Sequence, residues 1–305
     1  MFDNKTILIT GASGFLGKAI ASILTKKNVS IVSVSSQDVD LREKEDTERF
    51  FYEAEPDIVI HCAVQGGGIG WMKDHPVESG QDNLRMNLNA LEASYLCGAE
   101  SFVGVSSACV YPKQANQPYI EADIWQGYPE PFNGSYALSK RMMMDLGRAY
   151  AKQYGFHTVF PILANLYGPE DHISPERAHV VADLMIRCAQ NPDYLSVWGT
   201  GIAEREFLHV QDAAEGVLAC LQAPAGSFIN IGSGQSTSIL HLAEMIVAAH
   251  ELQIPIQLDA SKPDGQLKKV LNVQKAKQLF GWEAKIALSD GLRDTARWYR
   301  EQLSS

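Results

Sequence analysis

The stretch TILITGASGFLG, residues 6–17, decides the fold of this chain. Its first five residues are apolar or β-branched, which is typical of a strand buried within a parallel sheet. Gly11, Gly14 and Gly17 follow with the spacing G-x-x-G-x-x-G, and a helical pattern continues to Lys26. In a strand–glycine turn–helix unit, backbone N–H groups and the helix N-terminus bind a pyrophosphate. The stretch therefore predicts a dinucleotide site near the start of the chain, with a plain β–α turn as the alternative.

Short runs of β-branched and apolar residues alternate with helical patterns along the chain. Because such continuous apolar strands are covered by helices on both faces, the alternation predicts an α/β fold with a parallel sheet. Strands are expected at 6–10, 30–34, 57–63, 102–106, 158–163 and 228–231, and helices at 13–26, 82–96, 139–154, 238–250 and 289–302.

The texture of the sequence changes after residue 166, where proline and glycine become frequent. Both residues are typical of turns and loops. We therefore expect a dinucleotide-binding domain at 1–165, with a return of the chain to its sheet near 206–232. A smaller substrate domain is expected to come mainly from 166–305.

Composition narrows the classes of function. The chain has 305 residues, of which 46% are hydrophobic and 20% are charged, as in an ordinary globular protein. Its net charge of −10 lacks the Lys/Arg excess that neutralises phosphates, so nucleic-acid binding is not expected. A small anionic ligand stays compatible with this charge if a few basic residues converge.

Neither export, membrane insertion nor a metal site is expected. The N-terminus lacks a long apolar segment, and no window approaches the roughly 18 apolar residues of a membrane span. The five cysteines are scattered without a CxxC pair, so neither a disulfide framework nor a zinc site is expected. We therefore expect a protein of the reducing cytoplasm.

The end of the second expected strand bears on the choice of dinucleotide. An acidic residue there bonds the ribose 2′-hydroxyl of NAD, whereas a basic or small polar residue admits the 2′-phosphate of NADP. This strand ends in Val34-Ser35-Ser36-Gln37, and the first carboxylate is that of Asp38. The pattern favours NADP, although no arginine is present there, and NAD stays open.

A tyrosine and a lysine stand four residues apart at Tyr136 and Lys140. On a helix they share a face, and an ammonium beside a phenol lowers the pKa of the phenol. Tyr136 then becomes a usable proton donor or acceptor for a carbonyl or alcohol. Ser107, which follows another strand of the sheet, is placed to hydrogen-bond the same oxygen. A chance pair on a solvated helix face is the alternative.

The glycine turn, Ser107 and the Tyr136-x-x-x-Lys140 pair together resemble the extended short-chain dehydrogenase/reductase family. The resemblance covers essentially the whole chain. It implies a Rossmann doubly wound sheet, a smaller C-terminal α/β substrate-binding domain, a nicotinamide cofactor and hydride transfer at a sugar carbon. It also implies that the serine and the tyrosine bind the reacting oxygen and that the lysine holds the nicotinamide ribose.

Five further segments narrow the resemblance to members that act on GDP-linked sugars. These members epimerise GDP-4-keto-6-deoxy-mannose at C3 and C5, then reduce C4 with NADPH to give GDP-L-fucose or a related GDP-sugar. The matching segments are SACVYPK at 107–113, NLYGP at 165–169, WGTG at 198–201, REFLHV at 205–210 and SKPDG at 261–265.

This chemistry gives Cys109 a role. A 4-keto group acidifies the protons on both neighbouring carbons, so epimerisation needs one group to remove a proton and another to return one from the opposite face. A thiolate suits the first task and a histidine suits the second. The resemblance makes His179 the partner, and Ser107 with Tyr136 would hold the enolate oxygen. For Cys109 alone, the alternative is a small buried hydrophobic residue.

The resemblance also distributes the binding roles. Arginines suit a diphosphate because their planar forks donate in bidentate geometry, whereas a solvated charge is the alternative for each basic residue. The substrate would contact Ser107, Asn165, Val180, Arg187, Trp198, Arg205 and Lys262. The cofactor would contact Gly11, Ser13, Gly14, Phe15, Leu16, Gly17, Ser35, Ser36, Asp40, Leu41, Ala63, Tyr136, Lys140, Leu163 and His179.

Three other functions stay open. The glycine-rich run at 65–72 is also similar to that of a GDP-mannose 3,5-epimerase. A C4 reductase of another GDP-4-keto sugar, such as a deoxyheptose, would use the same Ser, Tyr and Lys. A dinucleotide-sensing protein on the same fold would bind cofactor without turnover. The family's usual homodimer would form through helices 82–96 and 136–154.

Overall fold

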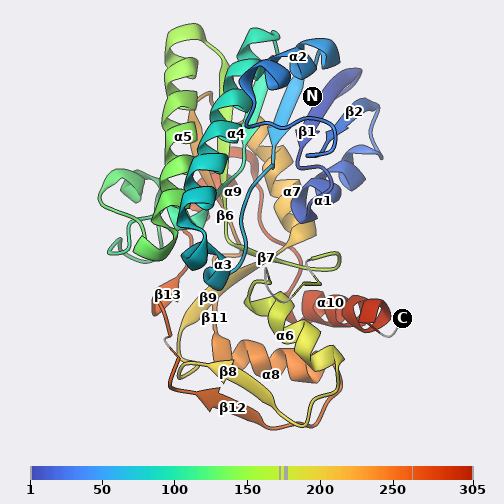
Figure 1. Ribbon diagram of the computed structural model, residues 1–305, viewed down its shortest axis with the longest axis vertical. Coiled ribbons are helices and arrows are strands. Elements are labelled where there is room, and N and C mark those ends of the chain that lie inside the picture. Colours follow the sequence, from blue (N-terminus) through green and yellow to red (C-terminus); the bar gives the residue numbers. More distant parts are fainter. Residues whose placement is uncertain (1, 172, 175–177, 263, 304–305) are drawn as a thin grey trace.

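The larger part of the molecule is built on a seven-stranded parallel sheet with the order β2-β1-β3-β4-β6-β10, in which β5 also pairs with β6 (Figure 1). The computed structural model describes residues 2–171, 173–174, 178–262 and 264–303. The strands are β1 (Lys5–Thr10), β2 (Val29–Val34), β3 (Ile58–His61), β4 (Ser101–Gly104), β5 (Ser106–Ser107), β6 (His157–Leu163) and β10 (Ser227–Ile231).

The direction in which the chain crosses this sheet decides which face each helix covers. From β1 the chain passes through α1 (Phe15–Leu24) to β2, and it then returns past β1 to β3. Because parallel crossovers are right-handed, this reversal places α2 (Lys44–Ala54) on the face opposite α1. Helix α2 packs beside α4 (Pro76–Leu96), which packs beside α5 (Gly134–Tyr154), while α1 packs against α7 (Val210–Ala219).

The same reversal marks the place for a ligand. Strand β1 pairs with β2 along one side and with β3 along the other. In an open parallel sheet, ligands bind at the carboxyl ends of the strands where the order reverses. The glycine turn that follows β1 lies at this point.

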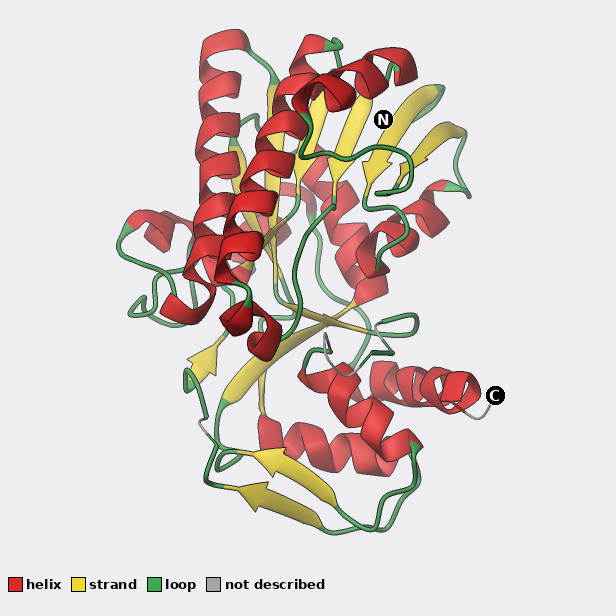
Figure 2. Cartoon of the chain, in the orientation of Figure 1, coloured by secondary structure: helices red, strands yellow, loops and turns green. Residues whose placement is uncertain are grey.

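The smaller part has its own sheets and its own core. Its buried apolar side chains form a cluster separate from the one that surrounds the larger sheet. A four-stranded sheet contains β7 (Asn165–Tyr167), β9 (Glu204–His209), β11 (Ser236–Ser238) and β13 (Lys268–Lys269), and β8 (Leu195–Trp198) pairs with β12 (Ile256–Asp259). The helices that pack in this part are α6 (Val180–Ala189), α8 (Ile239–Ala249) and α10 (Leu288–Leu303) (Figure 2).

The chain returns to the larger core twice. The first return, residues 208–231, supplies α7 and the edge strand β10. The second return supplies Leu271, Ala276 and Trp282, and its helix α9 (Gln274–Phe280) packs against β10. The sequence predicted only the first return, because the buried residues of the second are separated by polar ones and show no clear period.

The predicted fold class is confirmed, and the differences lie at element ends and in elements that were not predicted, including the apolar helices α6 and α7. Helices α4 and α5 begin at Pro76 and Gly134, earlier than the predicted residues 82 and 139. Helix α2 was missing from the predictions because KEDTERFFYEA is dominated by charge. Helix α3 (Ile69–Asp74) is short and falls within the glycine-rich run, which gave no helical period.

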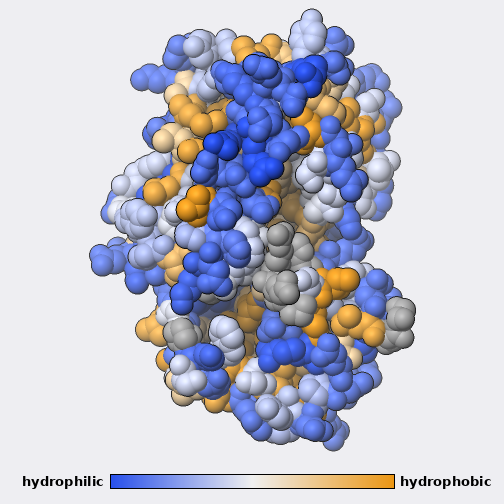
Figure 3. Space-filling model, in the orientation of Figure 1, coloured by the Kyte–Doolittle hydropathy of each residue, from blue (hydrophilic) through white to orange (hydrophobic). Residues whose placement is uncertain are grey.

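The outer surface of the larger part carries both hydrophilic and hydrophobic side chains (Figure 3). Hydrophilic side chains cover the outward side of α4 on the face shown in Figure 3. Along the described part of the chain, no helix is both long and apolar enough to cross a membrane.

Candidate active site

The glycine turn after β1 leaves no room for side chains at Gly11 and Gly17. Gly11 has φ +67°, and a Cβ there would lie 2.8 Å from the backbone of Ala63. A Cβ on Gly17 would lie 2.3 Å from the carbonyl oxygen of Gly11. The N–H of Gly14 donates to the same oxygen at 3.0 Å. A turn this close to its neighbours fits the close approach of a pyrophosphate to backbone N–H groups.

Three segments, the turn and start of α1 after β1 and the loops after β2 and β3, carry most of the other predicted cofactor residues, and they meet at the carboxyl ends of these strands. The N–H of Ala12 donates to the carbonyl of Val34 at 3.1 Å, which joins the first loop to the second. The N–H of Ala63 donates to Thr10 Oγ1 at 3.3 Å, which joins the third. The predicted residues on them are Ser13, Phe15 and Leu16 after β1, Ser35, Ser36, Asp40 and Leu41 after β2, and Ala63 after β3.

Ser107, Cys109 and Tyr136 lie together where β5 and α5 meet. The Ser107 hydroxyl accepts a hydrogen bond from the Cys109 N–H at 3.3 Å, and Ser107 lies close enough to Tyr136 to lower the pKa of its phenol. The thiol of Cys109, half-buried on the short 3₁₀ turn Ala108–Val110, is close enough to raise the pKa of Tyr136. Leu163 lies opposite Ser107 in the ladder between β5 and β6. The three polar groups therefore face one small volume.

The pKa of Tyr136 differs from its sequence-based expectation. Tyr136 is only 8% exposed, and burial raises its pKa more strongly than the neighbouring Ser107 lowers it. Burial also lowers the pKa of Lys140 to about 8. The ammonium of Lys140 donates to Asn87 Oδ1 at 3.4 Å. The tyrosine is thus held as a phenol, the form that can give a proton.

A buried polar chain behind Lys140 was missed by sequence reasoning. Asn87 Oδ1 accepts from Lys140 and lies 3.0 Å from His61 Nε2. Because an amide oxygen can only accept, the Nε2 atom of His61 carries the proton. His61 Nδ1 then accepts from Thr10 Oγ1 at 2.8 Å. Burial lowers the pKa of His61 to about 3, which keeps the ring neutral. Lys140 is thereby tied to β3, α4 and the end of β1.

Arg141 holds the turn that bears the thiol and was also missed. Its guanidinium is largely buried and donates to the carbonyls of Val110 and Gly127, both at 2.8 Å. Because Val110 follows Cys109 directly, this clamp fixes the turn on α5. A sequence signal for both missed groups was present: polar residues inside predicted helices at the period of the buried face, Asn87 in α4 and Arg141 in α5.

The predicted residues of the smaller part lie on α6 and on the loops around β8 and β9. His179 is exposed immediately before α6, and Val180 is its first residue. Residues 175–177, which precede them, lie outside the described part of the chain. Arg187 donates to Asp183 at 2.8 Å and to the Ser196 carbonyl at 2.6 Å. Its charge is therefore partly matched within the protein.

The remaining predicted contacts surround β9. Asn165 is exposed and donates to the Glu206 carbonyl at 2.8 Å, which fixes its side chain beside β9. Arg205 is half-buried, and burial lowers its pKa. Lys262 lies over the ring of Trp198 at 5.5 Å, and that ring is 64% exposed. Trp198 therefore offers an aromatic face outward and does not fill a core.

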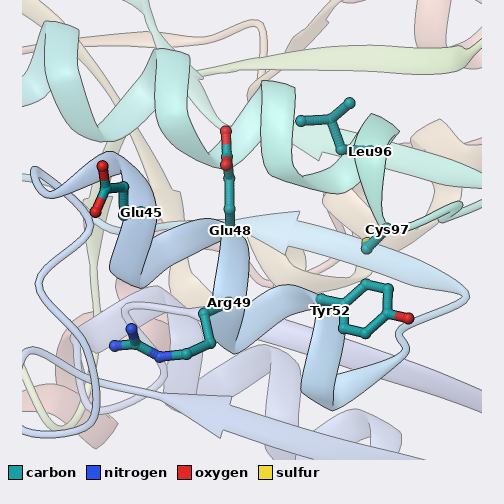
Figure 4. A pocket seen from close by; sticks show the side chains of 6 residues that line it. All are labelled: Glu45, Glu48, Arg49, Tyr52, Leu96 and Cys97. Carbon is teal, nitrogen blue, oxygen red and sulfur yellow. The ribbon is translucent and has the colours of Figure 1, made fainter.

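One surface hollow lies elsewhere. It sits between α2 and the end of α4 (Figure 4), where the helices lead into the amino ends of the next strands. That is the edge opposite the glycine turn, so the hollow takes no part in the site. Its lining residues are Glu45, Glu48, Arg49, Tyr52, Leu96 and Cys97. Across the described residues, no group of three or more His, Cys, Asp or Glu is arranged to hold a metal ion.

Fold and site together define a dinucleotide-dependent enzyme of the short-chain type. The chain belongs to the NAD dependent epimerase/dehydratase family, whose sequence profile matches residues 7–232. It is thus an NAD(P)-dependent enzyme, and the predicted resemblance is confirmed.

Several similar proteins are named for GDP-linked sugars. A probable GDP-L-fucose synthase 1 from Oryza sativa subsp. japonica is 34% identical over 98% of this chain and 93% of its own length. The crystal structure of a GDP-6-OMe-4-keto-L-xylo-heptose reductase from Campylobacter jejuni matches with a TM-score of 0.93 at 25% identity, covering 99% of both chains. A GDP-L-fucose synthetase from Naegleria fowleri bound to NADP matches with a TM-score of 0.88 at 30% identity, covering 100% of this chain and 97% of its own.

Proposed function

We propose that this chain is a nucleotide-sugar epimerase/reductase. It takes a GDP-4-keto-6-deoxy-hexose, in particular GDP-4-keto-6-deoxy-mannose, inverts C3 and C5, and reduces C4 to give GDP-L-fucose or a related GDP-sugar. The observation that carries the proposal is the meeting of Ser107, Cys109 and Tyr136 in one volume. A reductase alone needs the serine and the tyrosine, and the thiol is the additional group.

In the reductive step the protein holds the C4 oxygen and supplies its proton. Ser107 and Tyr136 hydrogen-bond the oxygen, and Tyr136, kept protonated by burial, gives it a proton as the C4–O bond becomes single. Lys140, held by Asn87 at 3.4 Å, would bind the nicotinamide ribose. The bound nicotinamide cofactor supplies the hydride that C4 receives.

In the epimerisation step the protein moves protons at the carbons beside C4. Cys109 as a thiolate removes a proton from one face, and the electron pair passes to the C4 oxygen. Ser107 and Tyr136 stabilise the resulting enolate through hydrogen bonds that strengthen as charge develops. His179 returns a proton from the opposite face, and the same sequence serves C3 and C5.

The smaller part of the molecule is proposed to bind the nucleotide end of the substrate. Arg205 and Arg187 are proposed to bind the diphosphate, since Arg187 keeps an Nε–H without a hydrogen-bond partner. Trp198, with Lys262 above its ring, offers a face for the base or ribose. Asn165 and Val180 complete the contacts. The division into a domain at 1–165 and one mainly at 166–305 is part of this proposal, supported by the two separate cores.

NADPH is the proposed reductant, supported by the NADP-bound relative from Naegleria fowleri. A homodimer through α4 and α5 is also proposed, because Leu138 and Met142 leave 41% and 47% of their surfaces exposed on α5. Light scattering of Met142→Glu against the unchanged chain tests the dimer. The cytoplasmic location stays a prediction.

A C4 reductase without epimerisation is the second candidate. The similarity to the heptose reductase, with a TM-score of 0.93, favours it. The two functions differ in what happens to the protons on C3 and C5, so an isotope experiment separates them.

The test is incubation of the chain with GDP-4-keto-6-deoxy-mannose and NADPH in deuterated water. Epimerisation with reduction gives deuterium at C3 and C5 and consumes NADPH. Cys109→Ser should slow deuterium incorporation about a hundredfold, whereas Cys97→Ser, a thiol in the hollow of Figure 4, should change nothing. Consumption of NADPH without deuterium would establish the simple reductase. Failure to consume NADPH would overturn both.

A further inference from the structure

Tyr119, in the loop that follows Cys109, is held by a late segment of the chain. Its N–H donates to the Val270 carbonyl and its carbonyl accepts from the Asn272 N–H, both at 2.9 Å. Its hydroxyl accepts from Gln266 Nε2 at 2.7 Å. The side chain is 1% exposed. The ring of Tyr119 is therefore fixed both at its backbone and at its hydroxyl.

Gln266 belongs to the loop beside the proposed diphosphate site. This loop leads from Asp264 into β13, which pairs with β9 at Arg205 (Figure 1). The Asp264 carboxylate accepts from the N–H and the hydroxyl of Thr200 at 2.7 and 2.9 Å, and its carbonyl accepts from Arg205 at 3.5 Å. The Gln266 amide also donates to the Lys113 carbonyl at 3.3 Å. Gln266 thus connects the smaller part to the loop after the thiol.

The Tyr119 ring in turn supports the turn that carries the thiol. It stacks on the ring of Tyr111, with centroids 4.5 Å apart and an angle of 9° between the planes. The Tyr111 N–H closes the turn by donating to the Ala108 carbonyl at 3.3 Å. Burial is the main cause that raises the pKa of Tyr119; Cys109 also raises it and Arg205 lowers it. The phenol therefore lies within electrostatic reach of both the thiol and the guanidinium.

Ser107 and Tyr136, which serve the reductive step, stand on elements of the larger part. Ser107 lies in β5, opposite Leu163 of β6, and Tyr136 lies in α5. The thiol turn, by contrast, is reached from the smaller part through Gln266 and the two stacked rings. The two halves of the proposed reaction are therefore supported by different contacts.

We propose that Gln266 and Tyr119 are positioning residues for Cys109, which tie its placement to the loop that binds the nucleotide end of the substrate. The proposal rests on the proposed function and concerns its epimerisation step. Proton removal by the thiol depends on this connection, whereas hydride transfer at C4 does not require it. Because a thiolate must meet a carbon-bound proton in a defined geometry, a displaced turn slows that step.

Two assays separate the steps. Proton removal is followed by mass as deuterium enters GDP-4-keto-6-deoxy-mannose in deuterated water, with NADP⁺ in place of NADPH so that no reduction occurs. Hydride transfer is followed as the initial rate of NADPH formation from GDP-L-fucose and NADP⁺. In this reverse step C4 gives a hydride to NADP⁺ and its hydroxyl gives a proton to Tyr136, and no proton moves at C3 or C5.

Tyr119→Phe keeps the stacked ring and removes the hydroxyl that accepts from Gln266. Deuterium exchange should slow about tenfold while hydride transfer stays within about twofold. Gln266→Leu should give the same split, and the double variant should lose no more than Gln266→Leu alone, because both changes break one connection. Gln126→Leu removes an amide that donates to Asp123 in the segment after Tyr119, and as the matched control it should leave both rates unchanged.

The outcomes distinguish this proposal from the proposed function. Exchange that both variants keep, or equal losses of exchange and hydride transfer, would overturn the positioning role and leave the epimerase/reductase standing. Absence of exchange by the unchanged chain would overturn the epimerisation and this proposal with it. Gln266 is half-buried in a loop, so Gln266→Leu decides the question even if Tyr119→Phe fails to fold.

Discussion

The cofactor edge and the sugar-binding side of this molecule are built in opposite ways. At the cofactor edge, backbone turns and buried side chains such as His61 and Asn87 fix each group through contacts from several elements. On the sugar side, His179 and Trp198 are exposed and stand on short strands and helix ends. Substitutions at the first should therefore damage both fold and function, whereas those at the second should alter substrate binding or catalysis and leave the fold intact.

The largest effect is expected at the proton donor. Tyr136→Phe keeps the ring and removes only the hydroxyl that meets Ser107, so the turnover number should fall about a thousandfold. Tyr154→Phe, an exposed tyrosine at the end of the same helix, is the matched control. Initial rates of cofactor oxidation measure both. A loss below tenfold in Tyr136→Phe would assign the proton to another group.

The glycine turn offers a way to separate backbone strain from crowding. Gly11→Ala places a methyl group 2.8 Å from Ala63 at a φ of +67°, and should lower the free energy of unfolding by about 2–5 kcal/mol. Gly155→Ala has φ +69° with nothing within 4 Å of the added atom, and should lower it by only about 1 kcal/mol. Denaturant titration compares the two variants. Equal losses would mean that the contact with Ala63 relaxes freely.

The buried network predicts a pH dependence of stability. His61 stays neutral in the folded chain down to a pKa of about 3, whereas it takes up a proton near pH 6.5 once unfolded. The unfolded state then binds more protons, so stability falls as pH drops from about 6.5 toward 3, by about 2 kcal/mol at pH 5.

His61→Gln should remove this contribution, while His241→Gln, an exposed histidine paired with Glu244, should keep it. Denaturant titrations at pH 7 and pH 5 measure the difference. The same slope in His61→Gln and the unchanged chain would show that other groups carry the pH dependence.

The smallest effect is expected on the sugar side. Trp198→Ala removes an exposed ring, so KM for the GDP-sugar should rise about tenfold while the melting temperature and cofactor affinity stay unchanged. Tyr194→Ala, just before the same strand, serves as the control because its ring is similarly exposed. A drop in melting temperature for Trp198→Ala would place that ring among the structural residues and blur the contrast between the two regions.

The same contrast explains what the sequence could predict. The conformations of the glycine turn and of the strands around it depend on residues a few positions away. A local sequence pattern can therefore predict them. The bond from Lys140 to Asn87 and on to His61 joins α5, α4 and β3, and no local period marks a contact between such distant positions. The meeting of Ser107 with Tyr136 was predicted from the strand end and the helix, whereas Cys109 was added to them only through the family resemblance.

The strand order has a consequence for how the protein is made. Strand β1 leaves the ribosome first, yet the edge strand β10 ends at Ile231, and Trp282 of a 305-residue chain still belongs to the same core. Part of the apolar surface of the early strands therefore stays exposed to solvent until the late segments of the core are synthesised. Such intervals favour aggregation and chaperone binding. We expect a nascent chain stopped at residue 165 to remain unfolded, because it carries the whole glycine turn but lacks the late segments of the core.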